Sequence, residues 1–426
     1  MWMDTLRGWP RRRAVVLVGL VAAVLVAACN EDLNGGAACP SLCPGQNVAV
    51  TDTVLDAVVL DTALSGLPSL GTEGALLLVA RGDTIDTRVI LRFDSLPTKV
   101  TRNGGDSAIT AIDSAYLLLR LTPSRTRVSA PVRIDLFDVD TTAADTAVGA
   151  LLPLFRDDRL LGGTTFDSAA VKDSLKVYFT NARLLAKIMG PARLRVGLRI
   201  SGAKGAVLSL GAFEAAAAAT LRFDPVPSDT AIKETTVDLK SSSPATNFEL
   251  QTDLIDYTIV AKAPPAPGAD LFSVGGLPAR RTYLRFNVPL RILDSATVLR
   301  ATLLLTQSPN RFLNANDSTL LIPQVVTAGE EVTDLMRVLG LLSAFPVDTL
   351  RVAPRDSGLK QIEVAAALRQ WNSTTNPFRQ QRALVIRSND EGLGVFEARF
   401  FSLEAAAALR PRLRVSYALR TSFGIP

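Results

Sequence analysis

A short pattern, Leu-Arg-Phe followed by a polar residue, recurs in this chain at 91–94, 221–224 and 284–287. Two of these copies lie inside longer matches, RVILRFDSLP at 88–97 and RTYLRFNVPL at 281–290, which are offset by 193 residues. In both matches apolar side chains alternate with charged or polar ones, and a period of two is typical of strands with one buried face. The repeated alternation therefore predicts that the same β-strand arrangement occurs twice along the chain.

Three further matches follow in the same order at offsets near 190. They join DSAYLLLRL (113–121) to LRATLLLTQ (299–307), RVGLRISGAKG (195–205) to ALVIRSNDEG (383–392), and AFEAAAAATLRFD (212–224) to SLEAAAALRPRLRV (402–415). We predict a mainly β fold of two tandem antiparallel β-sandwich domains, jelly-roll-like, with one or two short helices each. The first domain is expected at 50–226 and the second at 227–420, followed by a tail at 421–426.

Helix formers interrupt the strand pattern at corresponding places in the two copies. The segments 167–190 and 359–372 are predicted to be helical, the first ending at a glycine. The alanine runs 215–219 and 405–408 have high helix propensity, and we expect each to form one helical turn ahead of a closing strand.

The first 28 residues have the pattern of a bacterial lipoprotein signal peptide. Three arginines, Arg11 to Arg13, precede a fifteen-residue apolar run at 14–28. This run is shorter than the roughly 20 residues that cross a bilayer, although an uncleaved anchor helix is the alternative. The small residues before Cys29 resemble a lipobox, which implies lipidation of Cys29. We expect an exported protein, anchored by lipid to a bacterial membrane, the outer membrane on its periplasmic or surface side.

The residues after Cys29 predict a flexible tether at 29–49. Cys39 and Cys43 could close a small disulfide loop there in an oxidising compartment, whereas without histidine their spacing is a poor zinc signal. The chain has no cysteine after Cys43.

Composition limits the chemistry of the expected domains. The chain contains no histidine, which excludes Ser-His-Asp and Cys-His catalysis and most zinc and iron sites. Its formal charge of +5 falls to about +2 without residues 1–28, so we expect no nucleic-acid partner. We predict no enzyme activity and no cofactor. Three aspartates, Asp135, Asp138 and Asp140, are weak candidates for a structural calcium site.

Several motifs of the second copy resemble a known family. These are RTYLRFNVPL, ALRQWN, ALVIRSND and FFSLEAAAALRPRLRVSY, in that order. They resemble the DNRLRE-type domain, which is similar to β-sandwich carbohydrate-binding modules of bacterial surface proteins, including alginate binders. The first copy has no counterpart of Trp371. The resemblance implies a jelly-roll fold and glycan binding.

The candidate binding residues come from the alternating strands. Arginines on their polar faces could pair with carboxylates of an acidic polysaccharide, and Tyr283 could stack on a sugar ring. The candidates are Arg281, Tyr283, Arg285, Arg412, Arg414, Arg88 and Arg92. A solvated face with cross-strand Arg–Asp pairs is the alternative for the arginines. For Trp371, which follows an Ala/Leu helix pattern, core packing is favoured over sugar binding.

The leading functional hypothesis is a non-catalytic cell-envelope lipoprotein that binds glycans, with a preference for acidic polysaccharide. A structural or spacer protein of an envelope assembly is the second hypothesis. An unusual polysaccharide lyase or hydrolase that uses carboxylates or tyrosine is the third. The expected partners are the membrane, through the lipid, and either polysaccharide or envelope proteins.

Overall fold

The computed structural model describes residues 49–102, 104–201, 205–225, 234–241, 254–314, 317–372 and 380–420. The expected signal peptide with Cys29, the pair Cys39 and Cys43, and the tail lie outside the described residues. Within the described part of the chain, no helix is both long enough and apolar enough to cross a membrane.

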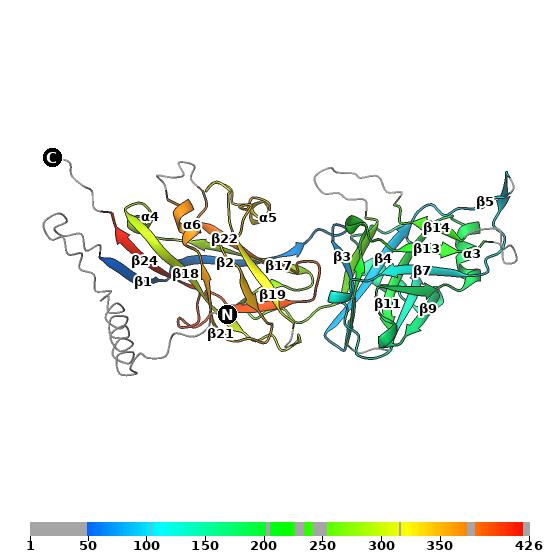
Figure 1. The fold of residues 1–426 in the computed structure, drawn as a ribbon, viewed down its shortest axis with the longest axis horizontal. Coiled ribbons are helices and arrows are strands. Elements are labelled where there is room, and N and C mark those ends of the chain that lie inside the picture. The colour runs from blue at the N-terminus through cyan, green and yellow to red at the C-terminus, as the bar shows by residue number, and fades with distance from the viewer. Residues whose placement is uncertain are drawn as a thin grey trace, which may run out of the picture. The chain divides into compact units, whose positions relative to one another are not determined.

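The fold is mainly β, as predicted, and every ladder between named strands is antiparallel. The helices are short: α2 (Val148–Leu151), α3 (Asn181–Met189), α4 (Leu290–Leu293), α5 (Leu335–Val338) and α6 (Ala365–Gln370). Single 3-10 turns occur between strands, among them η5 (Phe213–Ala215). The strands form two sandwiches (Figure 1).

The first sandwich packs two sheets around one core. One sheet has the order β12-β3-β4-β11-β8-β9, with β15 also on β4, and the other has the order β10-β7-β13-β14. Their bounds are β3 (Ala75–Arg81), β4 (Ile85–Phe93), β7 (Ala115–Arg120), β8 (Val132–Asp138), β9 (Leu160–Phe166), β10 (Ser174–Tyr178), β11 (Leu194–Ser201), β12 (Ala206–Gly211), β13 (Thr220–Phe223), β14 (Thr235–Asp238) and β15 (Asp256–Lys262). A separate hairpin joins β5 (Lys99–Arg102) and β6 (Gly105–Ala108). Leu91, Leu117 and Leu221, from facing sheets, are fully buried in the core.

The strands of the second sandwich are hydrogen-bonded into one continuous sheet, which supplies both layers. Its order is β1-β24-β18-β23-β16-β17-β22-β19-β20, with β2 paired to β17 and β21 paired to β18. Its strands are β1 (Val50–Leu55), β2 (Val58–Leu67), β16 (Leu271–Gly275), β17 (Ala279–Phe286), β18 (Ala296–Ser308), β19 (Thr319–Val325), β20 (Leu350–Val352), β21 (Gly358–Glu363), β22 (Ala383–Ser388), β23 (Glu397–Phe401) and β24 (Arg412–Leu419). The last residues of the long strand β18 pair with β23, which connects the two layers. Trp371 is buried in the core against Phe286 at a ring-centroid distance of 5.3 Å, so it packs inside.

Each sandwich is completed by a pair of strands that precedes the other repeat in the sequence. Strands β1 and β2 come first in the chain, yet they pair with β24 and β17 of the second sandwich. Strands β14 and β15 precede the second repeat, yet they pair with β13 and β4 of the first. Figure 1 shows the blue strands β1 and β2 beside the late strands of the chain. We call β1–β2 and β14–β15 the exchanged arms.

The pairing therefore divides the chain differently from the expected boundary between 226 and 227. Residues 50–67 belong by hydrogen bonding to the second sandwich, and the first sandwich extends to Lys262. Both arms occupy the same place in their sandwiches, because each adds one strand to the closing strand and one to the strand of the Leu-Arg-Phe pattern. The repeat of the sequence is thus also a repeat of the structure.

Strands replace half of each predicted helix. Within 167–190, residues 174–178 form β10, the α-helix covers residues 181–189, and a single 3-10 turn lies at 168–170. Within 359–372, β21 likewise precedes α6. The run 405–408 forms turns rather than a helical turn. The side chains of β10 explain why this segment is a strand. Leu175 and Val177, two residues apart, both insert into the core, and this tertiary packing overrides helix propensity.

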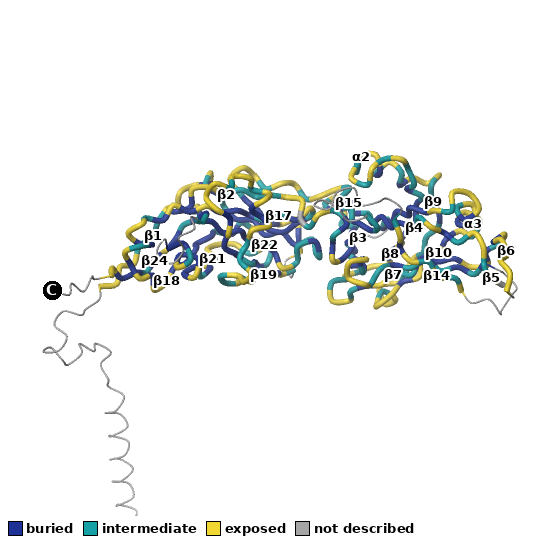
Figure 2. The backbone as a smooth tube through the Cα atoms, turned by 90° about the horizontal axis from the view of Figure 1, so that it is seen from above, coloured by how far each residue is buried: buried dark blue, intermediate teal, exposed yellow. Residues whose placement is uncertain are grey.

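In each sandwich, a second layer covers part of the outer face of the sheet that contains the Leu-Arg-Phe strand. In the first sandwich, Phe155 and Leu151 pack on Ile90 and Tyr257. In the second, residues 326–342 pack on Tyr283 through apolar side chains that include Val338. Figure 2 shows buried segments running through the interior of both sandwiches. The outer face of the sheet, which alternation predicts to be exposed to solvent, is therefore partly buried.

Candidate functional site

The predicted polar face of β17 is divided into a covered part and an open part. Arg281 lies under the cover, where its Nε donates to Glu391 Oε1 at 2.9 Å and its Nη1 donates to the Leu339 carbonyl at 3.1 Å. Tyr283 is 1 % exposed and donates its hydroxyl to the side-chain oxygen of Gln381. The exposed position expected for Tyr283 is therefore wrong.

The cover explains this error. Val326, Val338 and Leu339 surround the Tyr283 ring in a small apolar cluster separate from the main core. Burial raises the pKa of Tyr283, while the nearby Arg285 guanidinium opposes this shift. Alternation along β17 correctly separates two faces, but it contains no information about a distant segment that covers one of them.

Arg285 lies beyond the cover and is exposed. Neither Arg285 nor its neighbour Arg382 has an ion-pair partner within 4.0 Å in the described residues. Both line an open pocket of about 270 Å³. Its other lining residues are Val59, Phe286, Asn287, Glu330 and Gln381. We call this the arginine pocket.

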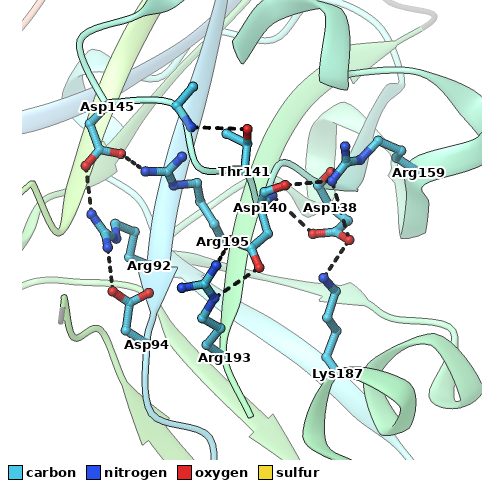
Figure 3. Close-up of polar contacts among 11 residues, drawn as sticks. Arg92, Asp94, Asp138, Asp140, Thr141, Asp145, Arg159, Lys187, Arg193 and Arg195 are labelled. Carbon is cyan, nitrogen blue, oxygen red and sulfur yellow. Dashed lines mark hydrogen bonds and ion pairs between the residues drawn. The ribbon is translucent and has the colours of Figure 1, made fainter. Parts of the chain in front are cut away.

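The equivalent place in the first sandwich is filled by a carboxylate of the chain itself. Arg92 Nη1 donates to Asp145 Oδ2 at 2.7 Å, and Arg195 Nη2 donates to Asp145 Oδ1. The hydroxyl of Tyr257 donates to the same Oδ1 at 2.7 Å, and Arg92 also pairs with Asp94 at 2.5 Å. Figure 3 shows Asp145 between the two guanidinium groups. Burial and the Asp145 carboxylate raise the pKa of the Tyr257 hydroxyl, which therefore stays protonated as a donor.

The two sandwiches differ at this place by a few substitutions within one framework. Arg92 faces Arg195 across the β4–β11 ladder, whereas Arg285 faces Ala383 across the β17–β22 ladder. Asp94, two residues after Arg92, corresponds to the neutral Asn287. At the position of Asp94 the second copy thus has a neutral side chain, and Glu330, which lines the pocket, makes no ion pair with Arg285 within 4.0 Å in the described residues. A carboxylate supplied from outside could take the role that Asp145 has in the first copy.

The remaining predicted binding residues are separate from this pocket. Arg88 pairs with Asp86 at 3.2 Å and lies over the Phe155 ring, so it is engaged within its own sandwich. Arg92 is buried in the ion cluster described above. Arg412 and Arg414 lie on β24, and neither lines the arginine pocket. Of the predicted set, only Arg285 is in the pocket.

The three aspartates considered for calcium are paired with cations instead. Arg133 Nε donates to Asp135 at 2.7 Å, Lys187 contacts Asp138 at 2.6 Å, and Arg193 contacts Asp140 at 3.1 Å. Figure 3 shows Asp138 and Asp140 among basic side chains. In the part of the chain that the structure describes, no three acidic side chains are placed to hold a metal ion. The residues present do not fit a calcium site.

Sequence reasoning missed Arg382, Asn287 and Asp145. A signal for Asn287 was present, because the fourth position of the repeated pattern changes from Asp to Asn between the copies. Arg382 directly precedes the ALVIRS match, outside the alternating strand. Asp145 lies outside the four sequence matches of the repeat, so no sequence pattern connected it to Arg92.

No family model matches the chain, and no curated protein matches it. Among solved structures, the tandem CBM22-1–CBM22-2 domain of Paenibacillus barcinonensis Xyn10C aligns at 9 % identity with a TM-score of 0.14, over 88 % of this chain and 99 % of that one. The infectious bursal virus derived T=1 particle aligns at 11 % identity with a TM-score of 0.11, over 86 % and 75 %.

Proposed function

We propose that this protein is an exported lipoprotein of the bacterial cell envelope that binds acidic polysaccharide through the arginine pocket and catalyses no reaction. One observation carries the proposal: two guanidinium groups without ion-pair partners in the described residues, Arg285 and Arg382, line an open pocket. At the equivalent place in the first sandwich, two guanidinium groups hold a carboxylate.

The proposal includes the anchor and the family. Lipid on Cys29 would hold the protein to the membrane, with residues 29–49 as the tether. The motifs of the second copy support a DNRLRE-type domain, and the mainly β fold is compatible with it.

The chemistry of the pocket favours a uronate. Guanidinium groups pair with carboxylates in a forked geometry that a neutral sugar does not offer. Asn287 can hydrogen-bond sugar hydroxyls, and the exposed side chain of Val59 offers apolar contact at the rim. Glu330 also lines the pocket, and its negative charge would disfavour polyanions that carry more negative charge than a polyuronate.

The test measures binding of the purified chain, without residues 1–28, to polymannuronate, polygalacturonate and neutral dextran. We expect binding to the polyuronates that weakens with salt, because the contact is ionic and open to solvent. Arg285→Ala and Arg382→Ala should each weaken binding about tenfold or more. Arg351→Ala, an exposed arginine on β20 of the same sandwich, is the matched control and should leave binding unchanged.

Two results would contradict the proposal. One is an absence of polyuronate binding at low salt, combined with capture of a stable envelope protein, which would favour the structural role. The other is turnover of any of these polysaccharides, abolished by a single carboxylate or tyrosine substitution, which would identify an enzyme.

A further inference from the structure

The exchanged arms carry an aspartate at the same register position in both sandwiches. Asp61 of β2 lies opposite Leu284, and Asp256 of β15 lies opposite Leu91. These two leucines are themselves equivalent in the sequence repeat. The duplication has therefore placed an acid at one defined point of each arm.

Both aspartates make the same hydrogen bond to the body of the sandwich. Asp61 Oδ2 accepts from the backbone N–H of Leu403 at 2.8 Å, and Asp256 Oδ2 accepts from the N–H of Phe213 at 2.9 Å. The residue after each donor is an acid, Glu404 or Glu214, and each raises the pKa of the neighbouring arm aspartate. Each arm is thus hydrogen-bonded to the body of its sandwich through an aspartate, and a glutamate lies close to that aspartate.

The fastening of β15 is the more buried of the two. Asp256 is 1 % exposed, and Glu73, two residues before β3, is 8 % exposed. Asp256 Oδ1 and Glu73 Oε2 are both buried without a hydrogen-bond partner. The charged groups that act on this pair are acids: Glu214 and Glu73 act on Asp256, and Glu214 acts on Glu73. Two buried acids with free oxygens and no cation to compensate them are stable in a protein when they carry protons.

A metal ion is the other ligand that such a site could take. Within the described residues, no group of three acids is arranged to hold one. The ligand that fits the geometry is the proton.

We propose that protons fasten the exchanged arms: protonated Asp256 and Glu73 hold β15 in the first sandwich, and their ionisation loosens it. Asp61 on β2 repeats the device in weaker form, because it is half-buried and has only Glu404 beside it. Burial raises the pKa of both Asp256 and Glu73 to about 7, from 3.8 and 4.5 respectively. Since both shifts are upward, the stabilisation is complete below the ordinary values and is lost as the pH rises through about 7.

Amide hydrogen exchange of the whole chain, followed on peptides that contain 256–262 and corrected for the intrinsic effect of pH, tests this device. We expect the opening constant of β15 to rise by up to about tenfold per pH unit for each proton released, between about pH 4.5 and about pH 7, and to level off above that range. Asp256→Asn keeps the acceptor for Phe213 and removes the charge, so it should flatten this dependence. Asp83→Asn, at an exposed turn of the same sandwich, is the control and should retain it.

Glu73→Gln provides a second test, independent of whether the first variant folds, and should also reduce the pH dependence. Protection of β15 that does not change with pH would overturn the proposal. The same holds for an unaltered pH dependence in both Asp256→Asn and Glu73→Gln. Calcium that restores protection at high pH in the wild type alone would show a cation site instead. None of these measurements depends on glycan binding.

Discussion

Arg285 faces Ala383 across the β17–β22 ladder, at the position where the first sandwich sets two arginines opposite each other. Ala383 and Asn287 leave a pocket open beside Arg285. At the equivalent place in the first sandwich, Asp145 and Asp94 pair with Arg92. This difference suggests how the pocket can be inactivated. A carboxylate introduced beside Arg285 should pair with its guanidinium and neutralise its charge.

We therefore expect Asn287→Asp to weaken polyuronate binding about tenfold, equivalent to about 1.4 kcal/mol. The introduced carboxylate would compete with the ligand for Arg285, as Asp94 pairs with Arg92 at 2.5 Å. Titration of immobilised polyuronate at low salt measures the effect. Asn389→Asp, at an exposed asparagine beyond β22, is the matched control for added negative charge. Equal weakening by both substitutions would mean that net charge, not the pocket, governs binding.

Tyr283→Phe should leave glycan binding unchanged and lower the free energy of unfolding by about 1 kcal/mol. The ring would stay in its apolar cluster, while the hydroxyl bond to Gln381 would be lost and leave a buried acceptor behind. Urea unfolding and polyuronate binding measure the two effects separately. Weaker binding with unchanged stability would contradict this prediction and would mean that the hydroxyl acts on the arginine pocket through Gln381.

The alternation of side chains was sufficient to predict the sandwiches. Leu91 and Phe93, and likewise Leu284 and Phe286, point into the cores as their spacing required. Period two reports which residues share a face, and in an antiparallel sheet one of those faces is buried.

The arms and the covers could not be predicted in the same way. Asp61 and Leu403 are 342 positions apart, and no periodicity within either segment connects them. Nothing in the pattern around Val50 or Asp256 states which copy of an equivalent strand each will join, because both copies offer the same type of partner. The burial of Tyr283 likewise depends on a separate segment, residues 326–342.

Cys29→Ala should abolish incorporation of labelled fatty acid when the full chain is expressed in a bacterium that processes lipoproteins. The thiol of Cys29 is the group that the lipobox resemblance assigns to lipid attachment. Cys39→Ala and Cys43→Ala, nearby in the sequence, are the controls and should retain the label. Continued labelling of Cys29→Ala would remove the anchor from the proposed function.

The free energy of unfolding should fall as the pH rises through neutrality, because the folded state holds protons on Asp256 and Glu73 that the unfolded chain has already released. The slope is at most about 1.4 kcal/mol per pH unit for each group between about pH 4.5 and about pH 7. Urea unfolding over this range measures it, and Glu73→Gln should reduce the slope. A stability that rises steadily across this range would contradict the upward direction of both pKa shifts.

The exchanged arms predict how the chain responds to a single cut. A specific protease site introduced after residue 228 separates the two sequence repeats, but each product keeps an arm that is paired in the other sandwich. We expect the two products to elute together in buffer and to separate only in denaturant, because the β2–β17 and β15–β4 ladders must open first. A second variant, cut within both 68–74 and 263–270, keeps the β1–β24 and β2–β17 ladders but leaves no ladder between the two sandwiches. Its middle product, which contains the whole first sandwich, should therefore separate from the rest at a lower urea concentration. If the products of the cut at 228 instead part in buffer as two folded species, the arms are not exchanged and each repeat folds by itself.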